Sequence, residues 1–155
     1  MTGGSHLAGQ ADVAQFPGLV TVTMTFRRPR TRRRHRDRAR FVCRVEHSTT
    51  IVAVRGDIDG SNAYDLLQEA RGRTVIRHAP LILDLTAVTF LGADGLRTLL
   101  AISRRHASTA PPWIVVPGRA ASRLLQIGDT ARQIPTAESV HEALTILFGD
   151  DLVNG

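Results

Sequence analysis

The sequence predicts an α/β fold, with a small, mixed and mostly parallel sheet on which about four helices pack. Over residues 41–148, short apolar runs alternate with segments in which apolar residues recur every three to four positions. This alternation is typical of parallel strands that are joined by helices. The first two apolar runs, at 41–46 and 50–55, are separated by a short polar link, which predicts an antiparallel hairpin at the start of the sheet.

The distribution of charge separates an N-terminal segment from this domain. All 20 basic residues are arginine, and nine of them lie between Arg27 and Arg40. From Phe41 onward, eleven arginines face twelve acidic residues, so this part of the chain is nearly neutral. The expected organisation is a low-order segment with an arginine tract at 1–40, a domain at 41–148 and a tail at 149–155.

The arginine tract has two interpretations. It is either a solvated tail or a surface for nucleic acid, an acidic protein or a membrane surface, and nucleic acid is expected to bind only through this tract. Ahead of the tract, residues 19–26 alternate between apolar and polar types and predict an edge strand.

Composition excludes several classes of protein. No segment approaches the ~20 consecutive apolar residues of a membrane span, and the first 26 residues lack the pattern of a secretory signal. We therefore expect a cytoplasmic protein. The single cysteine, Cys43, excludes an intramolecular disulfide and a cysteine-based zinc site, and its place in an apparent strand predicts a buried structural thiol.

The second strand ends in a loop that carries two carboxylates, Asp57 and Asp59. The residues after this loop predict a helix that continues to about residue 76, with an apolar face made of Ala63, Leu66, Leu67 and Ala70. Asp59 or Ser61 can cap this helix. Because two carboxylates are too few for a cation site with oxygen ligands, we expect turn and cap roles for both of them.

The stretch from Leu81 to Leu100 changes its hydrophobic period over a glycine-containing loop. Its first part, LILDL, is an almost continuous apolar run of the kind found in strands that are covered on both faces. From Leu96 onward the apolar spacing is helical. The loop between them, at 90–95, leaves free backbone N–H groups at the start of a helix and at the carboxyl edge of the sheet. Such edges are where α/β proteins place their binding sites.

The last third of the domain predicts one more strand and two helices. Residues 113–116 predict a short buried strand. A short helix follows and ends at Gly128, and its apolar side is made of Ala120, Leu124, Leu125 and Ile127. Ile134 and Pro135 are expected to form a last extended piece, after which Thr136 is expected to cap a closing helix.

The sequence lacks the motifs of common catalytic and cofactor sites. It contains no glycine-rich phosphate loop, no Gly-x-Ser-x-Gly elbow and no pair of histidines at metal-binding spacing. His106 and His141 are predicted to lie on polar helix faces. Because no nucleophile or acid–base pair can be assembled, we expect no enzyme, no cofactor and no metal, but a binding module.

Two segments resemble the two signatures of the STAS domain, the fold of bacterial anti-sigma factor antagonists, and the distance between them along the chain also agrees with that family. Residues 54–59, VRGDID, resemble the first signature, and residues 83–96, LDLTAVTFLGADGL, resemble the second and stronger one. The segment SVHEAL at 139–144 is similar to the ending of the family. The resemblance covers residues 41–148 and implies a STAS-like fold that acts by protein–protein binding.

In that family, a serine of the second signature is phosphorylated by an anti-sigma factor that is also a kinase, and only the unphosphorylated form binds the anti-sigma factor. Matched residue by residue, the phosphoacceptor position falls on Ala93 and the preceding acidic position on Gly92. Alanine has no hydroxyl, so the resemblance implies a protein that binds its partner without the usual phosphorylation switch at this site. Asp94 lies one position after the phosphoacceptor position, which is too late for a mimic of phosphoserine. We favour a role in which its negative charge stabilises the start of the helix. Thr89 and Thr98 are nearby hydroxyls but poor substitutes.

The leading hypothesis is a non-enzymatic protein of the anti-sigma factor antagonist type, which binds a kinase-type anti-sigma factor and so influences sigma-factor-dependent transcription. The residues expected to contact the partner are Asp57, Ile58, Asp59, Gly92, Ala93, Asp94, Gly95 and Arg97. One alternative is a STAS-like module that senses a small ligand or a nucleotide at the helix start beside Gly92 and Gly95. The other alternative is tethering to nucleic acid or to an acidic surface through the arginine tract.

Overall fold

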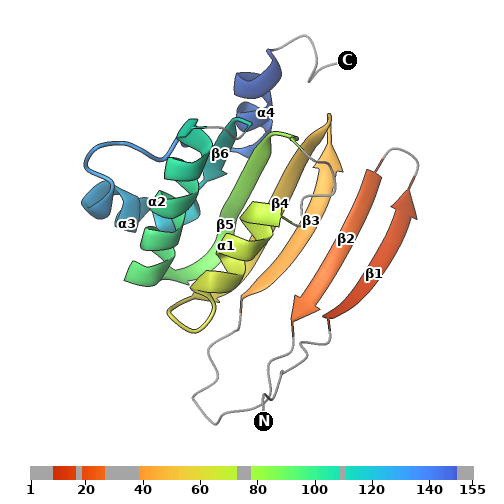
Figure 1. Cartoon of the computed structure of the whole chain (residues 1–155), viewed down its shortest axis with the longest axis horizontal. Coiled ribbons are helices and arrows are strands. Elements are labelled where there is room, and N and C mark those ends of the chain that lie inside the picture. Colours follow the sequence, from red (N-terminus) through yellow and green to blue (C-terminus); the bar gives the residue numbers. More distant parts are fainter. Residues whose placement is uncertain (1–8, 17–18, 27–38, 73–77, 109–110, 150–155) are drawn as a thin grey trace.

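The computed structural model describes residues 9–16, 19–26, 39–72, 78–108 and 111–149 (Figure 1). Within these residues the chain forms one sheet of six strands in the order of the sequence. The strands are β1 (Gly9–Phe16), β2 (Leu19–Phe26), β3 (Arg40–Glu46), β4 (Thr49–Ile58), β5 (Leu81–Leu91) and β6 (Trp113–Val116). The helices in the same residues are α1 (Ala63–Gly72), α2 (Ala93–Ser108), α3 (Gly118–Gly128) and α4 (Val140–Phe148).

The sheet is mixed. Strands β1 to β4 pair in antiparallel fashion, whereas β4, β5 and β6 are parallel. From β3 onward the parallel pairings predominate, so the expected mixed sheet with an antiparallel hairpin at its start is confirmed for this part of the chain. At the turn of the hairpin, His47 and Ser48 adopt positive φ angles of 48° and 57°, as in the tight turns whose twist matches that of paired strands.

The N-terminal strands differ from the expectation. Residues 19–26 form a strand, as predicted, but β2 lies between β1 and β3 and is not an edge strand. Strand β1 was not expected, because its sequence GQADVAQF shows no regular alternation of apolar and polar residues. Residues 27–38, which hold most of the arginine tract, lie outside the described residues. The division into a segment at 1–40, a domain at 41–148 and a tail therefore stays a prediction.

Two hydrophobic clusters hold helices on the two faces of the sheet. Helices α1, α2 and α3 share one cluster with the sheet, in which Val52 and Leu83 are at most 1% exposed. Helix α4 contributes to the other cluster, which contains Ile51 and Ile82. Neighbouring residues of β4 and β5 thus point to opposite faces, and both faces are covered at this level of the sheet. Figure 1 shows α1 and α2 lying in front of the sheet.

The closing helix begins later than the sequence indicated. Its N-cap is Ser139, whose hydroxyl accepts a backbone N–H of the first turn at 3.0 Å. Thr136, which was expected to be the cap, instead forms a parallel bridge with Val115 of β6. The extended piece predicted ahead of the helix is reduced to this bridge, in which the N–H of Val115 donates to the carbonyl of Pro135 at 2.9 Å. These long-range hydrogen bonds keep the backbone extended at a position where the local pattern indicated a cap.

Two side chains lie on other faces than predicted. Ile127, expected on the apolar side of α3, is 77% exposed. His106, expected on a polar face, is half-buried, and its ring stacks on Trp113 with the ring centroids 5.6 Å apart. Its Nδ1 also hydrogen-bonds the carbonyl of Pro111. His106 points inward because it follows Ile102 by four positions and therefore shares the buried side of α2.

Other predictions agree with the structure. Cys43 is 8% exposed and belongs to the core, which confirms a buried thiol, and His141 is exposed as expected. Helix α1 ends at Gly72, while residues 73–77, over which it was expected to continue, lie outside the described residues. Among the described helices, none combines the length and the apolar character that a membrane crossing needs.

Candidate functional site

The two loops that the sequence singled out meet at one edge of the sheet. Strands β4 and β5 are parallel, and their last residues, Ile58 and Leu91, are paired in register. The N–H of Gly92 donates to the carbonyl of Ile58 at 2.9 Å, which joins the two segments just beyond the strands. The structure therefore brings together residues 57–61 and 89–97, which we call the corner.

The loop after β4 is fixed by its own polar side chains. One oxygen of Asp59, Oδ1, accepts the backbone N–H of Ser61 at 2.9 Å and its hydroxyl at 2.6 Å. Asn62, which the sequence analysis did not single out, accepts the N–H of Asp59 at 2.9 Å and donates to the carbonyl of Asp57 at 2.8 Å. The predicted turn role of Asp59 is therefore confirmed, whereas the two hydrogen bonds that its Oδ1 accepts come from Ser61, which precedes α1, so the cap role stays a prediction.

Asp57 has a different partner, across the sheet. Its Oδ1 accepts the hydroxyl of Thr89 at 2.6 Å, which links the ends of β4 and β5. The turn or cap role predicted for Asp57 is therefore wrong, because its carboxylate links two neighbouring strands instead. Within the described residues, no group of three or more His, Cys, Asp or Glu side chains lies close enough together to hold a metal ion.

Asp94 connects the start of α2 with the loop before α1. It lies in the first turn of α2, where a negative charge is favourable, and its Oδ1 is 3.0 Å from Nη1 of Arg97. Its other oxygen lies 2.7 Å from the position that a Cβ atom at Gly60 would occupy. Only a residue without a side chain allows the loop and this carboxylate to approach so closely.

Two of the predicted contact residues support the corner from inside. Ile58 is 0% exposed, and Gly95 is buried at a point where a Cβ atom would lie 2.3 Å from Leu91 and 3.2 Å from Ile58. Gly95 therefore lets α2 pack closely on the ends of the strands. The side chain of Ile58 cannot touch a partner, so the surface of the corner is formed by its neighbours.

The position of the missing phosphoacceptor lies on the surface. Ala93 is the first residue of α2 and is exposed. The hydroxyl of Thr98 is buried and donates to the carbonyl of Ala63 at 3.4 Å, while the hydroxyl of Thr89 is held by Asp57. Both threonines therefore have structural roles.

Two exposed aromatic residues, one in the corner and one near it, were not among the contact residues that the sequence analysis predicted. Tyr64, in the first turn of α1, is 65% exposed, and Phe90, next to the end of β5, is 42% exposed. Exposed aromatic side chains are frequent at the centres of protein interfaces. The signal for Tyr64 was available, because it interrupts the polar side of a helix whose apolar side begins with Ala63.

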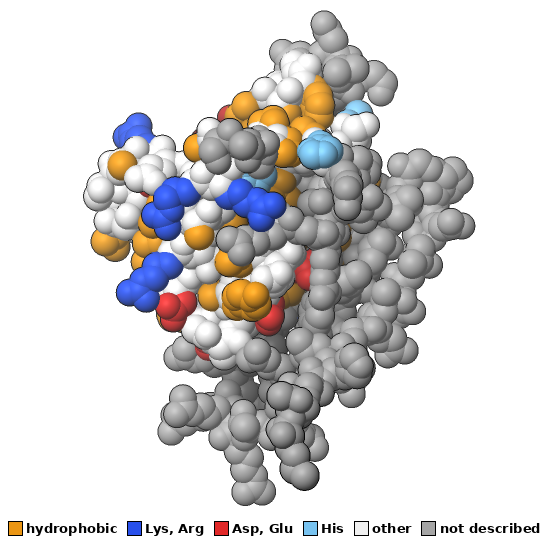
Figure 2. Space-filling view, in the orientation of Figure 1, with side chains coloured by type: hydrophobic (Ala, Val, Ile, Leu, Met, Phe, Trp, Pro, Cys, Tyr) orange, Lys and Arg blue, Asp and Glu red, His pale blue; other side chains and the backbone are white. Residues whose placement is uncertain are grey.

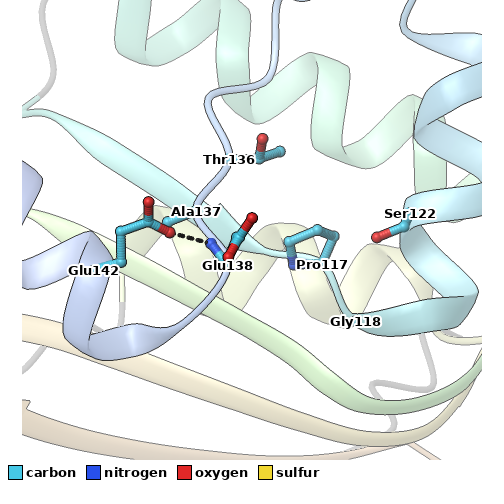
Figure 3. Close-up of a pocket in the computed structure, with 7 residues that line it drawn as sticks. All are labelled: Pro117, Gly118, Ser122, Thr136, Ala137, Glu138 and Glu142. Atoms are coloured by element: carbon cyan, nitrogen blue, oxygen red, sulfur yellow. Dashed lines mark hydrogen bonds between the residues drawn. The ribbon is translucent and has the colours of Figure 1, made fainter.

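A depression of ≈ 530 Å³ lies elsewhere, beyond the carboxyl end of β6 (Figure 3). It is lined by Pro117, Gly118, Ser122, Thr136, Ala137, Glu138 and Glu142. Figure 3 shows the carboxylate of Glu142 directed at the backbone N–H of Glu138, which donates to it at 2.5 Å. This carboxylate binds the backbone of the residue before the N-cap of α4, and we assign no ligand to the depression.

Comparison with known sequences identifies the family. The STAS domain family model matches residues 40–143. Osmosensory protein A of Mycobacterium tuberculosis (strain ATCC 25618 / H37Rv) is 27% identical over 104 residues, which cover 64% of this chain. The chain spans 65% of the length of that relative. Anti-sigma-F factor antagonist RsfB of Mycobacterium tuberculosis (strain CDC 1551 / Oshkosh) is 29% identical over 104 residues, which cover 66% of this chain and 84% of that protein.

Solved structures show the same fold. The crystal structure of an anti-sigma factor antagonist from Mycobacterium paratuberculosis matches with a TM-score of 0.61 and 26% identity, over 72% of this chain and 95% of that one. The anti-sigma factor antagonist SpoIIAA in its unphosphorylated form matches with a TM-score of 0.51 and 15% identity, over 68% of this chain and 93% of that one. The order of elements, the two signatures and these matches agree, and the chain belongs to the STAS domain family.

Proposed function

We propose that this chain is an anti-sigma factor antagonist, a non-enzymatic protein that binds a kinase-type anti-sigma factor and so influences sigma-factor-dependent transcription. The similarity to anti-sigma-F factor antagonist RsfB and to the antagonist from Mycobacterium paratuberculosis supports this assignment. The observation that carries the proposal is the corner, where the exposed start of α2 lies beside a preformed loop. Because sigma factors act on transcription, the proposal also places the protein in the cytoplasm.

The rigidity of the corner favours binding to a folded partner. The hydrogen bonds of Asp59 fix the loop, and the bond from Gly92 to Ile58 fixes this loop relative to α2. Preformed surfaces lose less conformational entropy when they bind. In this proposal the partner contacts the exposed Ala93, Asp94 and Arg97 together with the half-buried loop carboxylates.

Ala93 makes the association independent of phosphorylation at this position. Transfer of a phosphoryl group from ATP needs a nucleophilic side-chain atom, such as the hydroxyl oxygen of serine, and the methyl side chain of Ala93 has none. The neighbouring carboxylate of Asp94 is 3.0 Å from the guanidinium of Arg97, and the two groups form an exposed ion pair at the start of α2. We infer that the affinity for the anti-sigma factor is the same before and after exposure to ATP.

The test is isothermal titration calorimetry of the full chain with each kinase-type anti-sigma factor from the same genome. We expect saturable binding with an unchanged Kd after incubation with Mg-ATP. The matched variant Ala93→Ser restores an exposed hydroxyl, and its affinity is expected to fall roughly tenfold or more after the same incubation, because a phosphate adds like charge beside Asp94. If the wild-type chain binds none of these factors, the proposal is wrong. If ATP weakens wild-type binding, the independence from phosphorylation is wrong.

The two alternatives stay predictions. One alternative is a small ligand or nucleotide bound at the helix start, and the other is tethering through the arginine tract between Arg27 and Arg40. Two different measurements in solution test them. Nucleotide binding would raise the melting temperature of the isolated chain, whereas tethering would bind nucleic acid with a steep dependence on salt.

A further inference from the structure

We propose that the outer surface of α1 and α2 is a docking surface for an acidic helical segment of the protein partner. We call this surface the α1–α2 face and define it by Tyr64 of α1 and by Arg97, Ala101 and Arg104 of α2. The inference rests on the proposed function, because it names the chemistry of the partner that the corner binds. It goes beyond that function by extending the interface from the corner along α2.

The α1–α2 face follows from the helical spacing of α2. Residues at intervals of three or four positions lie on one side of a helix, which places Arg97, Ala101 and Arg104 together. The opposite side carries Leu99 and Ile102, which are 0% and 2% exposed and pack on the sheet. The side chain of Arg97 is 77% exposed, and Arg104 is exposed as well. The small, half-buried Ala101 lies between the two arginines, whose Cα atoms are about 10 Å apart by helix geometry.

Helix α1 contributes an aromatic side chain beside α2. The hydroxyl of Thr98 donates to the carbonyl of Ala63, so the first turn of α1 lies against α2. Tyr64 follows directly and is 65% exposed. Figure 2 shows basic side chains spaced along α2, with hydrophobic side chains and a few acidic ones near them on the same face of the molecule. Tyrosine and arginine are the residue types that most often dominate binding energy at interfaces.

The charge of the α1–α2 face selects an acidic occupant. Helix α2 carries Arg97, Arg104 and Arg105 but a single acidic residue, Asp94, at its start. Among the described residues, no carboxylate lies within ion-pair distance of Arg104, whereas Arg97 is paired with Asp94. Two glutamates seven positions apart on a partner helix repeat the spacing of the two arginines, and arginine binds carboxylates through paired hydrogen bonds.

An acidic protein segment fits this face better than a nucleic acid does. Binding of nucleic acid draws on many phosphate contacts, and each contact needs a cation. The α1–α2 face offers only a few arginines, and the first turns of the two helices carry the acidic residues Asp65, directly after Tyr64, and Asp94. We therefore treat nucleic acid as an outcome of the test.

The experiment compares two variants that carry the same change in charge. Arg104→Glu changes the α1–α2 face outside the corner, and Arg123→Glu changes an exposed residue of α3. Both variants keep the arginine tract, so any attraction of that tract for acidic molecules is the same in both. The probe is a fluorescein-labelled helical peptide of about 15 residues with two glutamates seven positions apart, and binding to the full chain is followed by fluorescence anisotropy.

We expect Arg104→Glu to raise the Kd of the peptide about tenfold and Arg123→Glu to change it less than about twofold, since only the first variant removes a direct ion pair. Tyr64→Ser is expected to raise the Kd about threefold or more. A peptide with glutamine in place of glutamate is expected not to bind. An equal effect of the two arginine variants, or no effect of either, overturns the inference. The inference is also overturned if a single-stranded DNA of similar length binds more tightly than the acidic peptide and if Arg104→Glu weakens that binding.

The same two variants separate this inference from the proposed function. If a kinase-type anti-sigma factor binds the wild-type chain and Arg104→Glu weakens it while Arg123→Glu does not, both proposals are supported. If the factor binds all three proteins equally, the proposed function stands and the docking surface is wrong. If no such factor binds the wild-type chain, the proposed function is wrong, and the peptide measurement alone decides the docking surface.

Discussion

The hydroxyl of Thr89 donates a hydrogen bond to the carboxylate of Asp57, with 2.6 Å between the two oxygen atoms. The two residues are 32 positions apart in the sequence and lie on β4 and β5. The contact lies beside a shift in the register of these strands, between Gly56 and Asp57. It therefore secures the strand ends that carry the corner at a place where the regular pairing is interrupted.

Replacement of Thr89 by valine keeps the β-branched shape and removes the hydrogen-bond donor. We expect Thr89→Val to lower the free energy of unfolding by about 0.5–1.5 kcal/mol, because the half-buried Asp57 loses one partner. Urea unfolding measures this change. Thr89→Ser keeps the hydroxyl and is expected to lose less stability than the valine variant. Equal stability of the two variants would show that water replaces the hydrogen bond without cost.

Replacement of Gly60 by alanine is expected to act through Asp94. The added Cβ atom would lie 2.7 Å from Oδ2 of Asp94, so the carboxylate must move and its contact with Arg97 weakens. Because this carboxylate is an exposed and flexible group, we expect a loss of stability below about 1 kcal/mol. A double-mutant cycle checks the mechanism. Gly60→Ala should cost less in an Asp94→Ala background, and additive effects of the two substitutions would exclude the contact as the cause.

Replacement of Gly118 by alanine is expected to be far more harmful. Gly118 begins α3 with a φ of +64°, and an added Cβ atom would lie 2.7 Å from the backbone of Thr86. We expect a loss of at least about 2 kcal/mol, from the left-handed conformation and from overpacking against β5. Gly149→Ala is the matched control, because Gly149 has a φ of +83° but no atom within 4 Å of the added group. It should cost only about 1–2 kcal/mol, and a loss as large as that of Gly118→Ala would rule out overpacking.

The central part of the fold could be predicted from the sequence because its signals are local. The change from a continuous apolar run to helical spacing around Gly92 predicted the passage from β5 to α2, although the expected loop at 90–95 is shorter in the structure, because β5 continues to Leu91 and α2 begins at Ala93. The resemblance of the same residues to the STAS signatures then identified the family, which the comparisons confirm.

The parts that were missed depend on contacts between distant residues. Thr136 has the side chain of a helix cap, but hydrogen bonds to β6 hold it in an extended segment and leave Ser139 as the cap. The partnership of Thr89 and Asp57 follows from the register of two strands with irregular pairing, which no pattern within either strand specifies.

His106 makes the stability of the fold depend on pH, and the stability is expected to fall as the pH is lowered. Burial lowers the pKa of His106 below 6.5, and the positive charge of Arg105 also lowers it, while the hydrogen bond to the carbonyl of Pro111 opposes the shift. The folded state therefore favours the neutral imidazole. Stability from this group is fully present above pH 6.5, the value for the unfolded chain, and is lost as the pH falls through the lowered pKa of the folded protein.

We expect the free energy of unfolding to decrease as the pH is lowered from about 7.5 toward 5, with a slope of at most about 1.4 kcal/mol per pH unit from this histidine. Urea unfolding followed by the fluorescence of Trp113, the single tryptophan of the chain, measures the effect beside the stacked ring. His106→Phe keeps an aromatic ring that does not titrate, and its stability should vary less over this range than that of the wild-type chain. His141→Gln, at an exposed position of α4, is the control and should keep the wild-type dependence. Identical pH profiles for wild type and His106→Phe would assign the dependence to other groups.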